Sequence, residues 1–562
     1  MLFFSSRVKY LLGHLAVITA VVGGDVGNPG DHSGGYPGGH SEDHHGGPSG
    51  GHSGSHSDHS GSHRSFHTLK LTNGRVSPDG FQRNAVLVNG GLFQTAITGN
   101  KGDEFAIKID NKLTNSLSHK STSIHWHGLF QHGTPWADGP AFVSQCPIAP
   151  GHQYTYRFSS ADQAGTFWYH SHLDAQYCDG LRGPFIIYDP GDPHRSLYDI
   201  DNKDTIITLA DWYHRDSNLL SGIVIPNSTL INGLGRTAQS PNTPLAVVNV
   251  KQGLRYRMRL VAISCDPNWI FSIEGHKLTV IEADGVSVQP VTVTSLQIFV
   301  AQRYSFVLHA NQPVGNYWIR ANPNIGPTGF DSNINSAILR YKGAPIAEPR
   351  GLGLQNSDNR LREPDLHPLF NPGAPGLAHV DGADINMVIN IGFIQSAGRF
   401  TIDGTSYVPP DVPTLLQILS GTPASSLLPS GSYIALPPNK VVQLSFPVFD
   451  GQGSALGGPH PIHLHGHTFD VIRSAGSSEY NFVNPPRRDV VAIGTPGDNV
   501  TIRFATDNAG PWYLHCHIEW HLRAGLGVVI AEDAPGLANG PEPPEEWKQL
   551  CPIYNALDPD DK

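Results

Sequence analysis

The stretch His515-Cys-His-Ile-Glu-Trp-His521, near the C-terminal end of the chain, indicates most about its fold and chemistry. Residues two apart on a β-strand point to the same face, so His515 and His517 can direct two imidazoles toward one point while Cys516 faces the opposite side. The His-X-His spacing recurs, and four such pairs could supply eight convergent ring nitrogens. The pairs are His125/His127, His170/His172, His463/His465 and His515/His517. So many ligands exceed the needs of one metal ion and indicate a cluster.

The opposite side of the same strand predicts a second metal site. His460 and His521 could join Cys516 there, and a trigonal set of two histidines and one cysteine is typical of an electron-transfer copper. Zinc is the rival metal, but structural zinc sites usually contain more cysteines and catalytic zinc sites need only three protein ligands. The alternative without metal is a set of scattered core histidines, and four pairs with a cysteine inside one of them argue against it.

Length and composition favour a β-rich protein of several domains. The chain has 562 residues, and glycine (62) and proline (45) together make up about a fifth of it. Short apolar or alternating runs, separated by Gly, Pro, Asn and Asp, begin near Leu69 and predict antiparallel β-sandwiches. Examples are residues 84–88, 105–109, 205–210, 256–261, 295–300 and 500–504. Because the His pairs lie at both ends of this region, the cluster should form between the first and last domains.

The first 67 residues look like a signal peptide followed by a low-complexity leader. Arg7 and Lys9 precede an apolar run, residues 10–22, that is too short for a membrane anchor, and we expect the signal peptide to end near residue 23. Residues 24–67 are rich in Gly, Ser and His and should be disordered, either as a flexible tether or as a loose metal-binding segment. The formal charge of −11 argues against nucleic-acid binding. We expect a secreted, extracellular protein without membrane attachment.

The cysteines fit an oxidising compartment. They are Cys146, Cys178, Cys265, Cys516 and Cys551. If Cys516 binds metal, an even number remains for two disulfides, and the sequence allows three pairings. N-glycosylation sequons begin at Asn227 and Asn499 and agree with secretion.

Four longer motifs resemble the signatures of the multicopper oxidase family. They are His125-Trp-His-Gly-Leu-Phe-Gln131 with Trp136-Ala-Asp-Gly-Pro-Ala-Phe142, Gly165-Thr-Phe-Trp-Tyr-His-Ser-His172, His460-Pro-Ile-His-Leu-His-Gly-His467, and His515-Cys-His-Ile-Glu-Trp-His521-Leu-Arg-Ala-Gly-Leu526. The similarity covers nearly all of residues 68–562 and is greatest to fungal laccases of the basidiomycete type. It implies an all-β fold of three cupredoxin-like Greek-key β-sandwich domains. We expect them at 68–195, 196–365 and 366–562, the last with the type 1 copper.

The resemblance also implies four copper ions and their ligands. The type 1 copper would take His460, Cys516 and His521; the type 2 copper His125 and His463; and the type 3 pair His127, His170 and His517 on one ion with His172, His465 and His515 on the other. His467 continues the strand alternation but is not a ligand in the family. Leu526 stands at the axial position of the type 1 site, and without a thioether ligand the reduction potential should be moderate to high. The implied disulfides are Cys146–Cys551 and Cys178–Cys265.

The implied activity is oxidation of phenols and diphenols, one electron at a time, coupled to four-electron reduction of O₂ to water. The electron would leave through His521, and Asp266 matches the substrate-binding carboxylate of the family, which can accept the phenol's proton. Asp138 and Glu519 would relay protons for O₂ reduction. The alternatives are another multicopper oxidase activity, such as Fe(II) oxidation, and a non-catalytic copper-storage protein. We expect a monomer whose partners are phenolic small molecules and O₂.

Two features depart from the close match to the family. The stretch 215–227, which should border the substrate pocket, aligns poorly and is shorter. Ile325 stands where close relatives often have an aromatic residue. Because of these two differences, the sequence does not determine which phenol is preferred. The expected reaction, one-electron oxidation of a phenol, is the same.

Overall fold

The computed structural model describes residues 63–114, 119–350, 359–448, 458–494 and 496–562. The predicted signal peptide and most of the predicted leader lie outside the described residues.

Strand β1 (Arg64–Val76) corrects the predicted start of the first domain at residue 68. The strand already begins at Arg64, because Arg64–Leu71 pairs in parallel with β4 (Glu104–Asn111). The last four residues assigned to the leader are therefore part of the first sheet.

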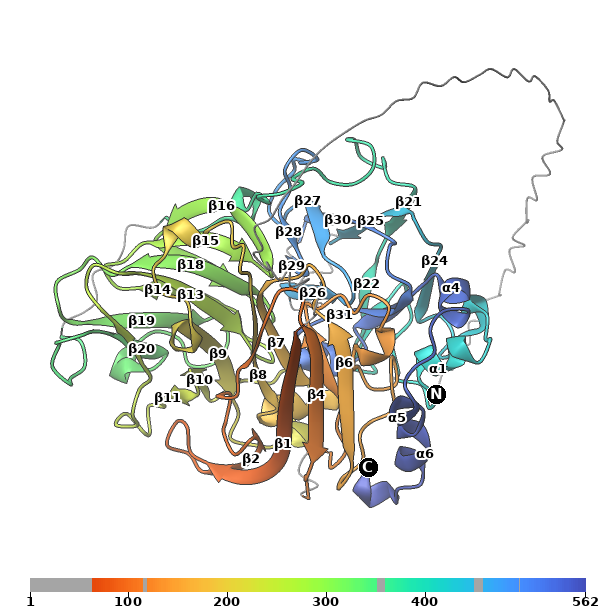
Figure 1. Ribbon diagram of the computed structural model, residues 1–562, viewed down its shortest axis with the longest axis horizontal. Helices are drawn as coiled ribbons and strands as arrows, with labels where there is room; N and C mark the ends of the chain where they lie inside the picture. Colours follow the sequence, from red (N-terminus) through yellow and green to blue (C-terminus); the bar gives the residue numbers. More distant parts are fainter. Residues whose placement is uncertain (1–62, 115–118, 351–358, 449–457, 495) are drawn as a thin grey trace, which may run out of the picture. The chain divides into compact units, whose positions relative to one another are not determined.

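The first third of the chain forms two four-stranded sheets (red to yellow in Figure 1). In order across the sheets, the strands are β2 (Arg83–Val88), β1, β4 and β6 (Gln153–Ser159), and β3 (Ile97–Asn100), β8 (Arg182–Tyr188), β7 (Gly165–Ser171) and β5 (Ile124–His127). In β6, Tyr154, Tyr156 and Phe158 are buried and alternate with more exposed residues, as expected for a strand with one face on the core. Trp126 of β5 meets Tyr156 edge to face at 5.1 Å between ring centroids.

The middle of the chain forms a seven-stranded and a five-stranded sheet. The first contains β11 (Leu234–Gly235), β10 (Ser228–Ile231), β9 (Ile206–Trp212), β13 (Arg255–Ala262), β18 (Arg303–His309), β15 (Leu278–Ala283) and β16 (Val286–Val293). The second contains β12 (Val247–Val250), β20 (Ser336–Tyr341), β19 (Asn316–Pro323), β14 (Trp269–Ile273) and β17 (Ser295–Ile298). Phe271 and Phe306, one from each sheet, lie in their shared core.

The last third adds two five-stranded sheets, a two-stranded sheet and short helices. One sheet contains β21 (Ile385–Val388), β25 (Val441–Pro447), β30 (Asn499–Ala505), β27 (Phe469–Arg473) and β28 (Arg487–Arg488). The other contains β24 (Tyr433–Leu436), β32 (Gly527–Glu532), β31 (Gly510–Cys516), β26 (His460–Leu464) and β29 (Val490–Ile493), and β22 (Ile391–Ile394) pairs with β23 (Arg399–Ile402). The α-helices are α1 (Thr414–Leu419), α3 (Glu519–Arg523), α4 (Ala534–Ala538), α5 (Glu545–Lys548) and α6 (Leu550–Asn555).

The predicted all-β class of cupredoxin-like sandwiches is confirmed, but the sheets are mixed rather than purely antiparallel. β1 and β4 run parallel, as do β3 and β8, and β24 and β32. Each pair is separated in sequence by other strands, because the chain crosses between the two sheets of a sandwich before it returns. The alternating runs in the sequence predicted correctly which residues are buried. They could not predict whether neighbouring strands run parallel or antiparallel.

Two disulfides connect distant parts of the chain, with the pairing that the family resemblance implied. Cys146 joins Cys551 with a Cα–Cα distance of 5.0 Å, and Cys178 joins Cys265 at 5.9 Å. Cys516 is a free, buried thiol. Within the described residues, no helix has both the length and the apolar character needed to cross a membrane.

Candidate functional site

The four His-X-His pairs lie together where strands of the first and last thirds of the chain meet. β5 and β7 supply two pairs, and β26 and β31 supply the other two, with one histidine of a pair in some cases just beyond the strand end. Figure 1 shows β7 near β26 and β31. The rings of His127 and His463 stack at 3.8 Å between centroids, and those of His125 and His465 at 3.9 Å. The structure therefore brings the expected histidines together across these strands.

The histidine nitrogens fall into overlapping groups whose members have the spacing of metal ligands. In each group the ligand atoms lie within 4.8 Å of one another. The groups are His125, His127 and His463; His127, His170 and His517; His172, His465 and His515; and His125, Asp138 and His465. The second and third groups contain the residues expected for the two type 3 ions, and the first contains both expected for type 2.

Backbone carbonyls and one carboxylate fix the orientation of these rings. The Nδ1–H groups of His125, His463, His170 and His515 donate to the carbonyls of Asp138, Asp489, Ser171 and Cys516 at 2.8–3.0 Å. Such bonds leave the lone pair on Nε2. The Nε2 atoms of His125, His170, His172 and His463 are buried and make no hydrogen bond. Buried nitrogens in this state are costly unless another partner is bound.

The contact between the rings of His465 and His515 favours a cation between them. The Nδ1–H of His465 donates to Asp138 Oδ2 at 2.9 Å, and that of His515 donates to the carbonyl of Cys516 at 3.0 Å. Both Nε2 atoms therefore carry lone pairs, yet they face each other at 3.1 Å. A metal ion coordinated by both lone pairs resolves this conflict, so the residues present fit a metal cluster.

Burial favours the neutral form of seven histidines of the cluster, and metal ligands must be neutral imidazoles. It lowers the pKa of His515 to about 3. Burial, together with neighbouring histidines, also lowers the pKa of His127, His170, His172, His463, His465 and His517 well below the usual value.

The opposite face of β31 forms the expected second site. The Sγ atom of Cys516 lies 3.7 Å from Nδ1 of both His460 and His521, and these two nitrogens are 3.0 Å apart. Burial raises the pKa of the Cys516 thiol well above its usual value, so a bound cation is needed to hold it as the thiolate. Leu526 is fully buried in the same core, and its carbonyl accepts the Cys516 N–H at 3.1 Å. Two imidazoles and one thiolate fit copper.

A pocket of about 520 Å³ opens onto this second site. His521 is half-buried and lines the pocket, together with Asp266. Most of the remaining wall is apolar or aromatic. It includes Phe299, Ile325, Phe393, Phe400, Pro461, Ile518 and Trp520. The pocket can therefore hold an aromatic ring beside the edge of the His521 imidazole.

The variable stretch 215–227 borders this pocket, as predicted, and so does Ile325. Gly222, Ile223 and Val224 line the pocket, and Ile223 is 90% exposed. The stretch is held from α3: the Arg523 guanidinium donates to the carbonyls of Ser217 and Leu220, both at 3.1 Å.

Asp266 is the acidic group of the pocket. It follows Cys265 in the loop after β13, and burial together with the negative charge of Asp211 raises the pKa of Asp266 to about 8. The carboxyl is therefore neutral in acid solution and ionises in the alkaline range, where it can accept a proton.

The two expected relay residues occupy different places. Asp138 follows the 3₁₀ turn Pro135–Ala137 and contacts the cluster, with Oδ1 3.2 Å from Nδ1 of His125. Glu519 is the buried first residue of α3, and burial and the charge of Asp174 raise its pKa well above the usual value. His467 lies outside every metal-ligand group found, as expected, and its Nε2 is 3.1 Å from Glu532.

Several pocket residues were not predicted from the sequence. Phe393, Phe400 and Phe299 come from distant loops and strands, and no motif marks them. Trp520 lies inside the fourth motif, where its position just before His521 was a usable signal. Asp211 was missed because its hydrogen bonds to the Asp266 loop join residues 54 and 55 positions apart in the chain.

Comparisons with known proteins agree with this site. Multicopper oxidase family models match residues 70–192, 203–344 and 407–536, together more than half of the chain. A laccase of Pycnoporus cinnabarinus is 59% identical over 499 residues, which cover 88% of this chain and 94% of that protein. A laccase of Trametes hirsuta is 58% identical over 501 residues, covering 88% and 95%.

Solved structures give the same result at lower sequence identity. The laccase from Botrytis aclada aligns with a TM-score of 0.76 and 31% identity, over 89% of this chain and 93% of that one. Fet3p, described as a multicopper oxidase that functions in iron import, aligns with a TM-score of 0.76 and 28% identity, over 88% and 96%. The fold, the sequence and the paired histidines lead to one conclusion: this chain belongs to the multicopper oxidase family.

Proposed function

We propose that the chain is a laccase, which oxidises phenols one electron at a time and reduces O₂ to water. The observation that carries the proposal is a single aromatic pocket whose wall contains both His521, a ligand of the cysteine site, and the carboxyl of Asp266. The high identity to known laccases over most of the chain supports the same activity.

The proposed cofactor is a set of four copper ions. We assign the type 1 ion to His460, Cys516 and His521, the type 2 ion to His125 and His463, and the type 3 pair to His127, His170, His517, His172, His465 and His515. Copper held there supplies one-electron oxidation of the substrate at the single ion and four-electron reduction of O₂ at the other three. Cys516 is joined through the main chain to His515 and His517, which gives a short covalent path between the two centres.

Two residues of the pocket have different roles in the oxidation of a phenol. His521 presents its ring edge to the pocket, and Asp266 offers a proton acceptor in the same wall. A phenol loses an electron far more easily when its proton leaves as well, so both groups act on one hydroxyl. The apolar wall binds the ring by excluding water from it.

Asp138 and Glu519 are the proposed proton relay for O₂ reduction. Asp138 lies against the rings of His125 and His465, and Glu519 is two residues from His517. Reduction of O₂ to water consumes four protons, and a buried carboxyl in contact with the cluster, Asp138, can deliver them with a second buried carboxyl, Glu519, on the following helix.

Fe(II) oxidation is the second candidate, favoured by the structural similarity to Fet3p. The pocket argues against it, because Asp266 is the only carboxyl among the described residues that line it. Since its pKa is raised to about 8, Asp266 is mostly neutral near pH 6 and is a poor ligand for a divalent cation. The remaining wall is largely apolar and suits an aromatic ring.

We also propose three domains, at residues 64–195, 196–365 and 366–562, in which the first is extended from the predicted start at residue 68 to include all of β1. Every sheet draws its strands from one of these ranges. Secretion and a monomeric state complete the proposal. Of the two sequons, Asn227 is exposed and suits an N-linked glycan.

The test is O₂ consumption by purified, copper-loaded protein with 2,6-dimethoxyphenol or Fe(II) under matched conditions. We expect a much larger kcat/KM for the phenol and loss of O₂ uptake in a folded Cys516→Ser variant. Preference for Fe(II) would contradict the assignment of the pocket. Retained O₂ uptake in Cys516→Ser would contradict the role of the cysteine site.

A further inference from the structure

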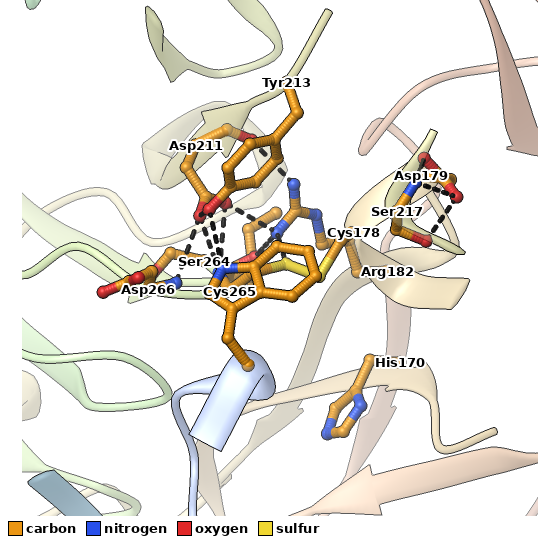
Figure 2. Close-up of a disulfide and its surroundings, with 12 residues drawn as sticks. His170, Cys178, Asp179, Arg182, Asp211, Tyr213, Ser217, Ser264, Cys265 and Asp266 are labelled. Atoms are coloured by element: carbon orange, nitrogen blue, oxygen red, sulfur yellow. Dashed lines mark hydrogen bonds and ion pairs between the residues drawn. A yellow bond between two sulfur atoms is a disulfide. The ribbon is translucent and has the colours of Figure 1, made fainter. Parts of the chain in front are cut away.

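Asp211 is a fully buried carboxylate directly behind the pocket wall that carries Asp266. It lies on β9 and accepts the backbone N–H of Cys265 at 3.0 and 3.1 Å and that of Asp266 at 3.1 Å. Figure 2 shows the Asp211 carboxylate directed at this loop, while the Asp266 carboxylate points away from it. One buried side chain therefore accepts the backbone N–H groups of both Cys265 and Asp266.

The same carboxylate is connected to the helix that carries His521. Tyr213 donates its hydroxyl hydrogen to Asp211 at 2.7 Å. The indole N–H of Trp520 donates to the Tyr213 oxygen at 3.4 Å, and the two rings meet edge to face. Because Trp520 precedes His521 on α3, one hydrogen-bonded chain runs from the loop of Asp266 to the helix of His521.

Covalent and ionic contacts make this arrangement stiff. Arg182 is fully buried; its guanidinium lies 3.2 Å from Asp211 Oδ1 and also donates to the Asp211 carbonyl at 2.9 Å. The Cys178–Cys265 disulfide holds the loop from its other side. Burying a carboxylate is expensive unless it is paired and hydrogen-bonded, and Asp211 has both kinds of partner.

We propose that Asp211 is a positioning residue that sets the separation of Asp266 and His521, so that one phenol hydroxyl can lose its proton to the Asp266 carboxylate and its electron through the His521 ring. The inference rests on the proposed laccase function. In the step, the phenolic O–H bond breaks, the proton goes to the Asp266 carboxylate, and the electron leaves through His521. A phenoxyl radical remains, and O₂ is the final oxidant.

Asp211 also acts on Asp266 through its charge. Its negative charge helps to raise the pKa of Asp266, after the larger contribution of burial. The other ionisable groups around this loop include Arg182 on β8, Tyr213 after β9, and Cys516 and His521 of the copper site. Glu519 of α3 is also close, because its backbone N–H donates to the Cys265 carbonyl at 2.8 Å. Loss of the Asp211 charge should therefore lower the pH at which Asp266 ionises.

The experiment compares Asp211→Asn with the parent protein, both copper-loaded, over a range of pH. The donors are 2,6-dimethoxyphenol and hydroxymethylferrocene, which gives up an electron without a proton. We expect kcat/KM for the phenol at alkaline pH to fall on the order of tenfold to a hundredfold, as for a misplaced reacting group. The ferrocene should lose much less. The midpoint of the phenol pH profile should move to lower pH.

Two further variants separate positioning from general damage. Asp192→Asn is the matched control, because Asp192 is also a buried aspartate that accepts from a tyrosine, Tyr198, and from an arginine, Arg257, but it does not line the pocket. It should leave the ratio of the two activities and the pH midpoint unchanged. Tyr213→Phe removes the connection to Trp520 and keeps both backbone bonds to Asp211, so it should lower the phenol activity selectively.

Equal losses with both donors in Asp211→Asn, or an unchanged pH midpoint, would overturn the proposal. If Asp211→Asn does not fold, Tyr213→Phe decides: unchanged phenol activity in that folded variant would also overturn it. A parent protein that prefers Fe(II) to the phenol would instead refute the proposed function.

Discussion

Replacement of Asp266 by Asn should reduce phenol oxidation by a factor that grows with pH. The substitution keeps the size of the side chain and removes its ability to accept a proton. Asp266 lines the pocket beside His521, and no described metal-ligand group includes it, so the copper sites should stay intact.

The magnitude follows from the ionisation of Asp266. Its pKa is raised to about 8, so about 1% of the molecules have the carboxylate form at pH 6 and about half have it at pH 8. A positioned general base contributes on the order of a thousandfold, within its usual range of 10²–10⁴. The parent should therefore exceed Asp266→Asn by about tenfold at pH 6 and by about 500-fold at pH 8.

The assay measures kcat/KM of both proteins for 2,6-dimethoxyphenol from pH 5 to pH 9. The ratio of parent to variant at each pH cancels the effects of pH on the phenol itself and on O₂ reduction. Hydroxymethylferrocene, which releases no proton, should give a ratio that stays near unity. A phenol ratio that does not change with pH, or one that the ferrocene reproduces, would refute the role of Asp266 as the proton acceptor.

Three other substitutions test separate parts of the structure. Loss of the Cys146–Cys551 disulfide in a double serine variant should lower the free energy of unfolding by about 2–5 kcal/mol, measured by guanidinium denaturation, since the bridge closes a loop across 405 residues; unchanged stability would contradict this. Leu526→Met introduces a thioether beside the type 1 site and should lower its reduction potential in a redox titration, whereas a higher potential would argue against the axial position. Arg523→Met removes the donors that hold the pocket loop and should raise KM for phenols more than it lowers kcat; equal KM values would show that the loop does not depend on Arg523.

The grouping of the proposed metal ligands was predictable because strand geometry repeats every two residues. The alternation of His515, Cys516 and His517 assigns them to opposite faces of β31, and the structure places His515 and His517 in the cluster and Cys516 beside His460. The alternation alone would also have included His467. The His467 ring instead faces Glu532, and His467 belongs to none of the metal-ligand groups found.

The rest of the site depended on contacts that no local pattern reports. Asp211 acts on a loop 54 residues away, and the aromatic residues of the pocket come from separate strands and loops. Parallel strand neighbours were missed because burial patterns are the same in both directions. The start of β1 at Arg64 was missed because Gly, Ser and His composition continues up to the strand, whose pairing with β4 is set by backbone hydrogen bonds.

The most direct test of the laccase assignment is the simultaneous measurement of O₂ consumed and phenol oxidised by the copper-loaded protein. Four one-electron oxidations per O₂, with no hydrogen peroxide released, are expected if the histidine cluster completes the reduction to water. Two oxidations per O₂ with accumulation of peroxide would contradict a joint function of the two centres.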